Sequence, residues 1–267
     1  SEDGEGVADT GDKVTITGEN FGTDPSDISV SFNGTPAEFE LVDESTIVAT
    51  TPADYQTGSV TVTIHGYTMT GGAMFNPNSK GDVTVLYLQN YKQPFAKAND
   101  ESWKNGEWWT PAVWNQNAAS FNAKGNTTVS GMQYKSEEGL TLAFQNGWDK
   151  EAYTNGKMWQ VATLRPGKYR LEVTYAYTLV VTDAGNFISV LIAKGDSESD
   201  IPNVADLEQL NGVYVAYDKM GTANDSGTLV TPSFEVTETT DVVIGFLTSL
   251  AKGNSYFKVT ELKLILE

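Results

Sequence analysis

The stretch Met158-Trp-Gln-Val-Ala-Thr-Leu-Arg-Pro-Gly-Lys-Tyr-Arg-Leu-Glu-Val-Thr-Tyr175 carries the clearest structural signal in the chain. From Tyr169 to Tyr177, apolar side chains at odd positions alternate with polar side chains such as Arg170 and Glu172. A period of two is typical of a β-strand with one face in the core. Because Arg165-Pro-Gly167 is a turn sequence, the stretch predicts two strands joined by a short turn.

Further strand patterns surround this pair. Asp82–Leu88 and Gly139–Phe144 alternate, whereas Phe187–Ala193 and Val242–Leu247 are almost continuously apolar, as strands buried on both faces are. Eight or more strands over residues 81–267, antiparallel by their turns, indicate a jelly-roll β-sandwich. Helical periodicity is confined to Val204–Leu210, where one short helix is expected.

The last strand contains a change of parity. Phe257 and Val259 lie on one parity, whereas Leu262, Leu264 and Leu266 lie on the other. One face can hold both sets only if the strand gains one residue in between. The sequence therefore predicts a β-bulge near Thr260-Glu261.

The first 80 residues form a separate block of short strands. Lys13–Thr17, Ser29–Phe32, Thr46–Thr50 and Ser59–Ile64 alternate, and Asn33-Gly34 is a strong signal for a two-residue hairpin. This pattern indicates a small β-sandwich over residues 11–77, preceded by an acidic tether over residues 1–10. The turn formers of residues 76–81 mark the boundary with the larger domain.

Composition excludes several classes of function. The formal charge of −18 disfavours binding to nucleic acid and to anionic lipid. The chain has no Cys and only one His, His65, which we expect at an exposed strand end, so thiol chemistry and His-rich metal sites are excluded. No apolar run is long enough to span a bilayer.

All six tryptophans lie between residues 103 and 159, most of them among Asn, Gly, Thr and Pro, which is a loop composition. Exposed indole rings can stack on the C–H faces of sugars, while amide side chains bind the hydroxyl groups. The same rings could instead seal the sandwich as a structural plug, with the amides pairing their N–H groups. Trp159, inside the strand Met158–Leu164, is expected in the core. The candidate stacking residues are Trp103, Trp108, Trp109, Trp114 and Trp148, and the candidate polar contacts are Asn115, Asn117, Asn146 and Asp149.

Carboxylate patterns give two weaker candidates. Asp196, Glu198 and Asp200 alternate along the chain and could hold a structural calcium ion, although a solvated acidic loop has the same pattern. A glycoside hydrolase would need two carboxylates facing one cleft, and no pair stands out among the 35 acidic residues. We therefore expect no catalysis, and no cofactor other than this calcium.

Two segments resemble known families. Gly11-Asp-Lys-Val-Thr-Ile-Thr-Gly-Glu-Asn-Phe-Gly22 is similar to the opening of IPT/TIG immunoglobulin-like domains, and the following strands keep the spacing of that family through residue 77. The usual Pro-x-Ile leading segment is absent, so the first strand is expected to be missing or short. Met158–Leu171, with the terminal Tyr256–Leu264 strand, resembles galactose-binding-like jelly rolls.

The resemblances carry functional implications. The set Trp108, Pro111, Trp114 and Asn117 resembles an uncharacterised Bacteroidetes domain that is often appended to IPT/TIG modules in exported lipoproteins. The acidic start resembles the residues that follow a lipidated Cys, although an ordinary disordered acidic terminus has the same composition. These resemblances imply an outer-membrane surface lipoprotein, with the lipid anchor upstream of residue 1 and the IPT/TIG domain as a spacer.

The sequence thus predicts an all-β chain, in which a small immunoglobulin-like sandwich precedes a larger jelly-roll sandwich. Our hypothesis is that the monomeric protein captures polysaccharide or oligosaccharide at the bacterial surface without catalysis. The alternative is a structural or adhesion protein whose sandwich docks onto a protein partner.

Overall fold

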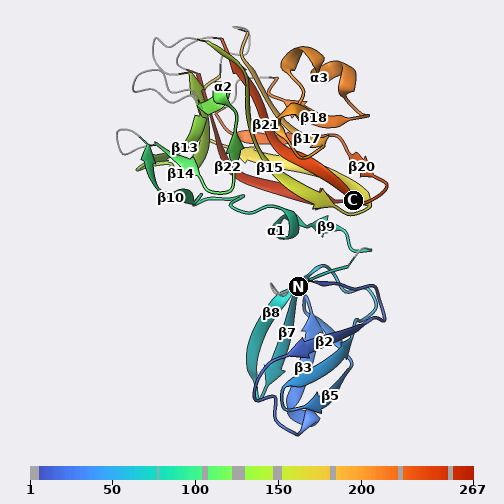
Figure 1. Ribbon diagram of the computed structural model, residues 1–267. Helices are drawn as coiled ribbons and strands as arrows, with labels where there is room; N and C mark the ends of the chain where they lie inside the picture. The colour runs from blue at the N-terminus through green and yellow to red at the C-terminus, as the bar shows by residue number, and fades with distance from the viewer. Residues whose placement is uncertain are drawn as a thin grey trace. The chain divides into compact units, whose positions relative to one another are not determined.

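A computed structural model describes residues 6–76, 78–103, 108–121, 130–146, 152–180, 185–221, 225–251 and 255–267, with side chains described for all of these except 99–103 and 121. The chain divides into two compact units, Ser1–Leu86 and Tyr87–Glu267 (Figure 1). Among the described residues, no helix has the length and apolar content that a membrane span needs.

The smaller domain is a sandwich of two mainly antiparallel sheets. Its core packs Phe32 against Tyr55, with ring centroids 5.4 Å apart, and includes Ile47 and Val62. The first sheet has the order β1 (Gly6–Val7), β8 (Tyr67–Phe75), β7 (Gly58–Ile64), β3 (Ile28–Phe32), β4 (Thr35–Ala37), and the second has the order β2 (Lys13–Thr17), β6 (Thr46–Thr50), β5 (Phe39–Asp43). A 3₁₀ turn, η1 (Pro25–Asp27), precedes β3.

The hairpin at Asn33-Gly34 is confirmed. Phe32 pairs with Thr35, and both turn residues have positive φ, 45° for Asn33 and 83° for Gly34. Positive φ at both positions defines the type I′ turn, which Asn-Gly adopts with little strain.

The acidic tether predicted over residues 1–10 does not extend over residues 6–8, which belong to the folded domain. Gly6 and Val7 form β1, which runs parallel to β8 and pairs with Met74 and Phe75. Ala8 is buried in the core and donates its N–H to the Phe75 carbonyl. The domain therefore begins by residue 6, and its first strand is short, as expected.

The segment between the domains also differs from the prediction. Instead of one strand over Asp82–Leu88, the chain forms β9 (Gly81–Asp82) and the four-residue helix α1 (Thr84–Tyr87). The Asp82 carboxylate accepts hydrogen bonds from the Thr84 N–H and hydroxyl, at 3.0 and 2.5 Å. Asp side chains favour helix starts in this way, because they satisfy a backbone donor that the first turn leaves open.

The larger domain is a jelly-roll sandwich, because the chain crosses repeatedly between two sheets (Figure 1). We call them sheet C and sheet D. Sheet C has the order β10 (Lys97–Trp103), β11 (Trp108–Pro111), β13 (Ser130–Lys135), β14 (Gly139–Asn146), β22 (Ser255–Leu266), β16 (Gly167–Tyr175), β19 (Gly227–Val230), with β20 (Phe234–Val236) also on β16. Sheet D has the order β12 (Asn115–Gln116), β15 (Tyr153–Leu164), β21 (Thr240–Leu250), β17 (Phe187–Lys194), β18 (Val215–Lys219).

Aromatic rings fill the space between sheets C and D. Phe144 and Phe257 from sheet C contact Phe246 from sheet D, with centroid distances of 4.9 and 6.5 Å. Tyr175 stacks beside Phe257 at 5.4 Å. These contacts fix the inner face of sheet C as the one that carries Phe144 and Phe257.

The predicted bulge in the last strand is confirmed. Thr174 on β16 pairs with Glu261, whereas Tyr175 pairs with Val259, so Thr260 is the extra residue. Beside it, the segment Tyr91–Gln93 forms an isolated bridge with β22: the Gln93 N–H donates to the Thr260 carbonyl, and the Leu262 N–H donates to the Tyr91 carbonyl. The bulge lets β22 keep apolar side chains inward on both sides of it.

Sheet D is covered on its outer face as well. The predicted helix α3 (Val204–Leu210) is confirmed and, with Ile201, packs over β15, β17 and β21 around Trp159 and Leu191. The 3₁₀ turn η3 (Glu198–Asp200) leads into this layer. The short helix α2 (Ala118–Phe121) lies between β12 and β13 in the chain. Apolar burial on both faces explains the continuous apolar runs of β17 and β21.

Candidate functional site

Trp159 lies in the core, as predicted. Its side chain is 7% exposed and packs with Leu191, Val243 and Leu247 beneath α3. This cluster lies outside the sandwich interior, on the covered face of sheet D. Trp159 therefore stabilises the attachment of the helical layer.

Trp114 is buried in the sandwich interior and is no surface contact. Its ring lies 5.7 Å from that of Phe246, and its Nε1–H donates to the Asn90 carbonyl at 3.0 Å. A buried indole with a satisfied N–H has the properties of a structural plug. Sugar stacking by Trp114, one of the predicted contacts, is corrected by this burial.

Trp108 and Trp109 are neighbours on β11 but face opposite ways. Trp109 pairs with Met132, on the inner face of sheet C, and is half-buried. Trp108 pairs with Gln133 on the outer face and is only 4% exposed. The prediction of an exposed stacking ring is therefore corrected for Trp108, because its surface is covered. Trp109 retains an accessible part.

Three predicted site residues cannot be placed. The backbone of Trp103 ends β10 and pairs with Trp108, but its side chain lies outside the described residues, as do Trp148 and Asp149 altogether. Sugar contact by these three stays a prediction.

The predicted amide contacts divide by burial. Asn115 is exposed and donates one long hydrogen bond, 3.4 Å, to the Trp159 carbonyl. Asn117 is buried: its Oδ1 accepts from the backbone N–H groups of Ser120 and Lys157, and its Nδ2 donates to the Asn155 carbonyl. All three of its bonds tie α2 to β15, so the predicted sugar contact is corrected for Asn117.

Asn146 is fully buried at the end of β14. Its Nδ2 donates to the Leu250 carbonyl at 3.2 Å, whereas its Oδ1 has no hydrogen-bond partner in the structure. Its role as a direct sugar contact is corrected by this burial.

The acidic turn does not gather its carboxylates around a metal position. Asp200 accepts hydrogen bonds from the Ser197 N–H and hydroxyl, the Asp196 N–H and the Tyr214 hydroxyl. The hydrogen bond from the Ser197 hydroxyl is the largest of the effects that lower the pKa of Asp200. Within the described residues, no group of three His, Cys, Asp or Glu could hold a metal ion. The calcium site predicted at Asp196, Glu198 and Asp200 is thereby corrected to a capped turn.

A buried lysine fastens the same turn to sheet D. The Nζ of Lys157 donates to the carbonyls of Ile201 and Glu198, at 2.6 and 3.2 Å. Burial lowers the pKa of Lys157, and the charge of Glu198 acts against that effect. Lys157 thus ties the turn that contains Glu198 and Ile201 to β15.

His65 follows β7 as expected. Its side chain is 68% exposed, and its Nδ1 lies 3.4 Å from the Asp27 carboxylate.

The outer side of sheet C carries polar and aromatic side chains that the sequence analysis did not predict as a site. Direct cross-strand partners share a face, and successive residues alternate between faces. Because Phe144 and Phe257 point inward, their neighbours Gln145 and Tyr256 pair with each other on the outer face. Lys258 and Ala143 form the next outer pair. We call this set, together with the outer pair Gln133 and Thr141 and with Glu138, the outer C face.

Lys258 is the centre of the outer C face. Its side chain is 6% exposed and forms an ion pair with Glu138, whose side chain is 21% exposed. The Lys258 Nζ also lies 5.3 Å from the centroid of the half-exposed Tyr256 ring, a cation–π distance. An ammonium, a carboxylate and an aromatic ring are thus held together on one face of the sheet.

Two polar atoms beside this centre lack partners. Gln133 and Thr141 face each other across β13 and β14, and both Gln133 Oε1 and Thr141 Oγ1 are buried without a hydrogen bond. Buried polar atoms in folded proteins almost always have a partner, so these two oxygens are positions for bound water. The alternation of Ser255-Tyr-Phe-Lys-Val259 places Tyr256 and Lys258 outward, and this was the signal in the sequence.

Two tandem β-sandwich domains, the larger with a polar and aromatic sheet face, define a modular β-sandwich protein. Residues 89–245 match the family model described as Domain of unknown function (DUF5013), and residues 5–79 match the IPT/TIG domain. The chain belongs to the DUF5013 family and carries an IPT/TIG domain before it. Comparison with curated proteins found no match.

Solved structures that are similar to this chain match it at low identity. A candidate glycoside hydrolase from Bacteroides thetaiotaomicron is 11% identical with a TM-score of 0.44, covering 86% of this chain and 83% of that one. A xylan-binding domain from Paenibacillus barcinonensis is 11% identical with a TM-score of 0.30, covering 64% and 97%. An adhesin domain of Lys-gingipain from Porphyromonas gingivalis is 11% identical with a TM-score of 0.35, covering 67% and 97%. At this level of similarity, they assign no ligand to this chain.

Proposed function

We propose that the larger domain binds a glycan without catalysis, and that the outer C face is its binding surface. The observation that carries the proposal is the grouping of the half-buried Tyr256 ring and the Glu138 carboxylate, whose side chain is 21% exposed, around Lys258. Sugars offer both C–H faces and hydroxyl groups, so an aromatic ring with donors and acceptors around it matches their chemistry.

The position of the outer C face supports this choice. On the opposite sheet, α3 and Ile201 cover the face around Trp159. Gln145 and Tyr256 are both half-buried and lie in one row across β14 and β22, and the exposed Leu179 extends that row, because it pairs with Tyr256. A ligand along this row would cross the strands.

The chemistry of the described carboxyl groups favours binding over hydrolysis. A glycosidase acid needs a raised pKa, so that it holds its proton at neutral pH. Within the described part of the chain, the carboxyl groups with a shifted pKa, which are Asp24, Asp43, Asp200 and Glu267, have it lowered by hydrogen bonds.

The cellular context stays a proposal as well. An exported, lipid-anchored surface protein would place a glycan-binding domain outside the cell, with the smaller domain between it and the anchor. Sugar stacking by Trp109, Trp103 and Trp148 is part of the same proposal.

The test is titration calorimetry of the chain against xylan, mannan, β-glucan, pectin and host mucin glycans. With the glycan that binds, Tyr256→Ala and Lys258→Met should each weaken binding about tenfold or more, as the loss of a central contact does. Tyr217→Ala is the matched control, because this half-buried tyrosine lies on β18 and bonds to Glu208. Absence of binding throughout, or equal binding by all three variants, would overturn the proposal.

A further inference from the structure

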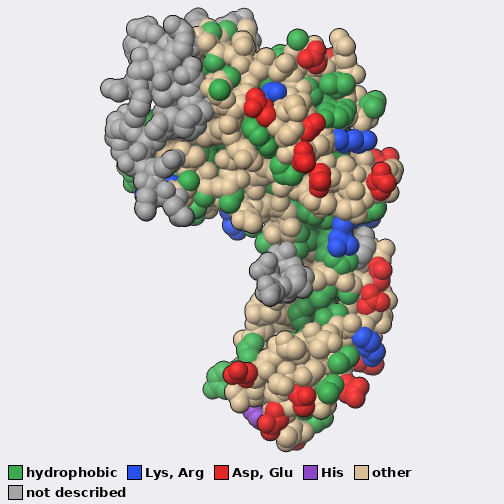
Figure 2. All heavy atoms as spheres, in the orientation of Figure 1, with side chains coloured by type: hydrophobic (Ala, Val, Ile, Leu, Met, Phe, Trp, Pro, Cys, Tyr) green, Lys and Arg blue, Asp and Glu red, His purple; other side chains and the backbone are tan. Residues whose placement is uncertain are grey.

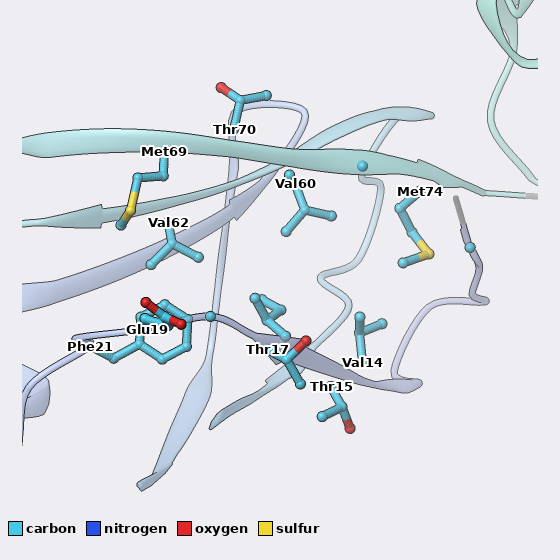
Figure 3. A pocket seen from close by; sticks show the side chains of 15 residues that line it. Val14, Thr15, Thr17, Glu19, Phe21, Val60, Val62, Met69, Thr70 and Met74 are labelled. Atoms are coloured by element: carbon cyan, nitrogen blue, oxygen red, sulfur yellow. The ribbon is translucent and has the colours of Figure 1, made fainter. Parts of the chain in front are cut away.

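A groove of about 480 Å³ opens along one side of the smaller domain, between β2 and β8. Its lining is mainly apolar, and Figure 3 shows Met69, Val60, Val62 and Met74 of one sheet opposite Phe21 and Val14. The groove lies wholly within this domain, so it is separate from the outer C face.

The groove exposes side chains that point toward the core. Met69 pairs with Val62, which is 6% exposed, yet Met69 itself is 44% exposed. Val14 and Ile16, the inward residues of β2, are only half-buried and pack against the same core. The sandwich is therefore open where these residues meet.

Within the described residues, both walls of the groove end in strand edges that are wholly or largely unpaired. β2 is the edge of its sheet, and β8 is paired on its outer side only by β1, at Met74 and Phe75, as far as the described residues show. Exposed edges normally carry charges or proline that block pairing, whereas the segment Tyr67–Phe75 contains neither. A bulge opposite Val60, at Gly71 and Gly72, leaves Tyr67–Thr70 as the regular part of the edge.

The charge of the smaller domain restricts what can enter the groove. Residues 1–86 contain 14 Asp and Glu against 2 Lys, a net charge of −12 within the −18 of the whole chain. Asp and Glu side chains are scattered over the visible face of this domain (Figure 2), and Glu19 lies at the groove itself. A second copy would bring the same negative charge, so self-association through this edge is disfavoured.

We infer that the groove binds an extended segment of a partner protein in which apolar residues alternate with Lys or Arg. The segment adds to the Tyr67–Thr70 edge as a strand: its backbone bonds to β8, and its apolar side chains cover Met69, Val14 and Ile16. Its basic side chains, on the other face, are attracted by the net negative charge of the domain. Strand addition of this kind takes affinity from backbone hydrogen bonds and specificity from alternate side chains.

The probes are fluorescein-labelled nine-residue peptides: a Lys–Val repeat, and Glu–Val and Lys–Ser repeats of the same length. The Lys–Val peptide should bind the whole chain at least tenfold more tightly than the other two, and more weakly as salt rises. The bound Lys–Val peptide should slow hydrogen exchange of the backbone amides in Tyr67–Thr70. Equal binding of Lys–Val and Lys–Ser would reduce the site to charge attraction and overturn the inference.

Two substitutions on one strand provide the matched comparison. Met69→Lys should abolish binding of the Lys–Val peptide, whereas Thr68→Lys, which adds the same charge on the outward face, should change it less than about twofold. If Met69→Lys fails to fold, Val14→Thr is the substitute test. It keeps the side-chain shape and should weaken binding of the Lys–Val peptide severalfold. Peptide affinity that the groove substitutions leave unchanged would refute the inference. So would dimerisation through β8, measured by analytical sedimentation.

Discussion

The distinction between structural and ligand-binding amides predicts opposite outcomes for Asn115→Ala and Asn117→Ala. Asn117 makes three hydrogen bonds of 2.8 to 3.0 Å and is 7% exposed. Its truncation loses about 1 kcal/mol per bond and leaves the buried N–H of Lys157 and of Ser120 unpaired, for a total of roughly 3–6 kcal/mol. Asn115 is exposed and makes one weak bond, so its loss should cost less than about 0.5 kcal/mol.

Urea unfolding followed by tryptophan fluorescence is the assay. All six tryptophans lie in the larger domain, so the signal reports on that domain alone. With a urea slope of about 2 kcal/mol per molar, Asn117→Ala should lower the midpoint by roughly 1.5–3 M. A variant that keeps the wild-type midpoint but loses glycan binding would refute the structural role of Asn117.

Two further predictions concern buried aromatic side chains. Trp114→Ala should destabilise the larger domain by about 3–5 kcal/mol in the same assay, because it empties core space beside Phe246 and frees the Asn90 carbonyl; a variant with wild-type stability would contradict the burial of this ring. Tyr55→Phe should cost the smaller domain about 1 kcal/mol at neutral pH, since the Tyr55 hydroxyl donates to the Ala8 carbonyl. Burial, and then the charges of Asp9 and Asp12, raise the pKa of Tyr55 to about 12 from 10.0, so its stabilisation is complete below pH 10 and is lost as pH rises through 12. Calorimetric scans at pH 8 and about pH 11 should therefore show the difference between wild type and Tyr55→Phe shrinking, and an unchanged difference would contradict the shift.

Local patterns predicted much of the fold. The alternation at Tyr169–Tyr175 corresponds to β16, the Asn33-Gly34 turn is a type I′ hairpin, and the change of parity after Val259 is the bulge at Thr260. Each of these signals is contained within a few neighbouring residues. The Asp82–Leu88 prediction failed because a side-chain bond from Asp82 to Thr84 turns the backbone there.

The candidate site was harder to predict because burial depends on distant partners. Nothing near Trp114 in the sequence shows that the Asn90 carbonyl will receive its N–H, 24 residues away. The outward direction of Trp108 follows from its register with Gln133, and the two amides Asn115 and Asn117 look alike until β15 packs beside them. Composition located the aromatic region, but it did not indicate on which face of its sheet each side chain lies.

The docking of Tyr91 against Leu262 brings the two ends of the larger domain together. The Leu262 N–H donates to the Tyr91 carbonyl at 2.7 Å, and the remaining strand to Leu266 spans only about 13 Å. When the first and last segments of a domain are hydrogen-bonded neighbours, the domain can be inserted into a loop of another protein. It can also be circularly permuted with a linker of a few residues. The backbone hydrogen bonds on either side of the bulge at Thr260 therefore join the first residues of the larger domain to its last strand.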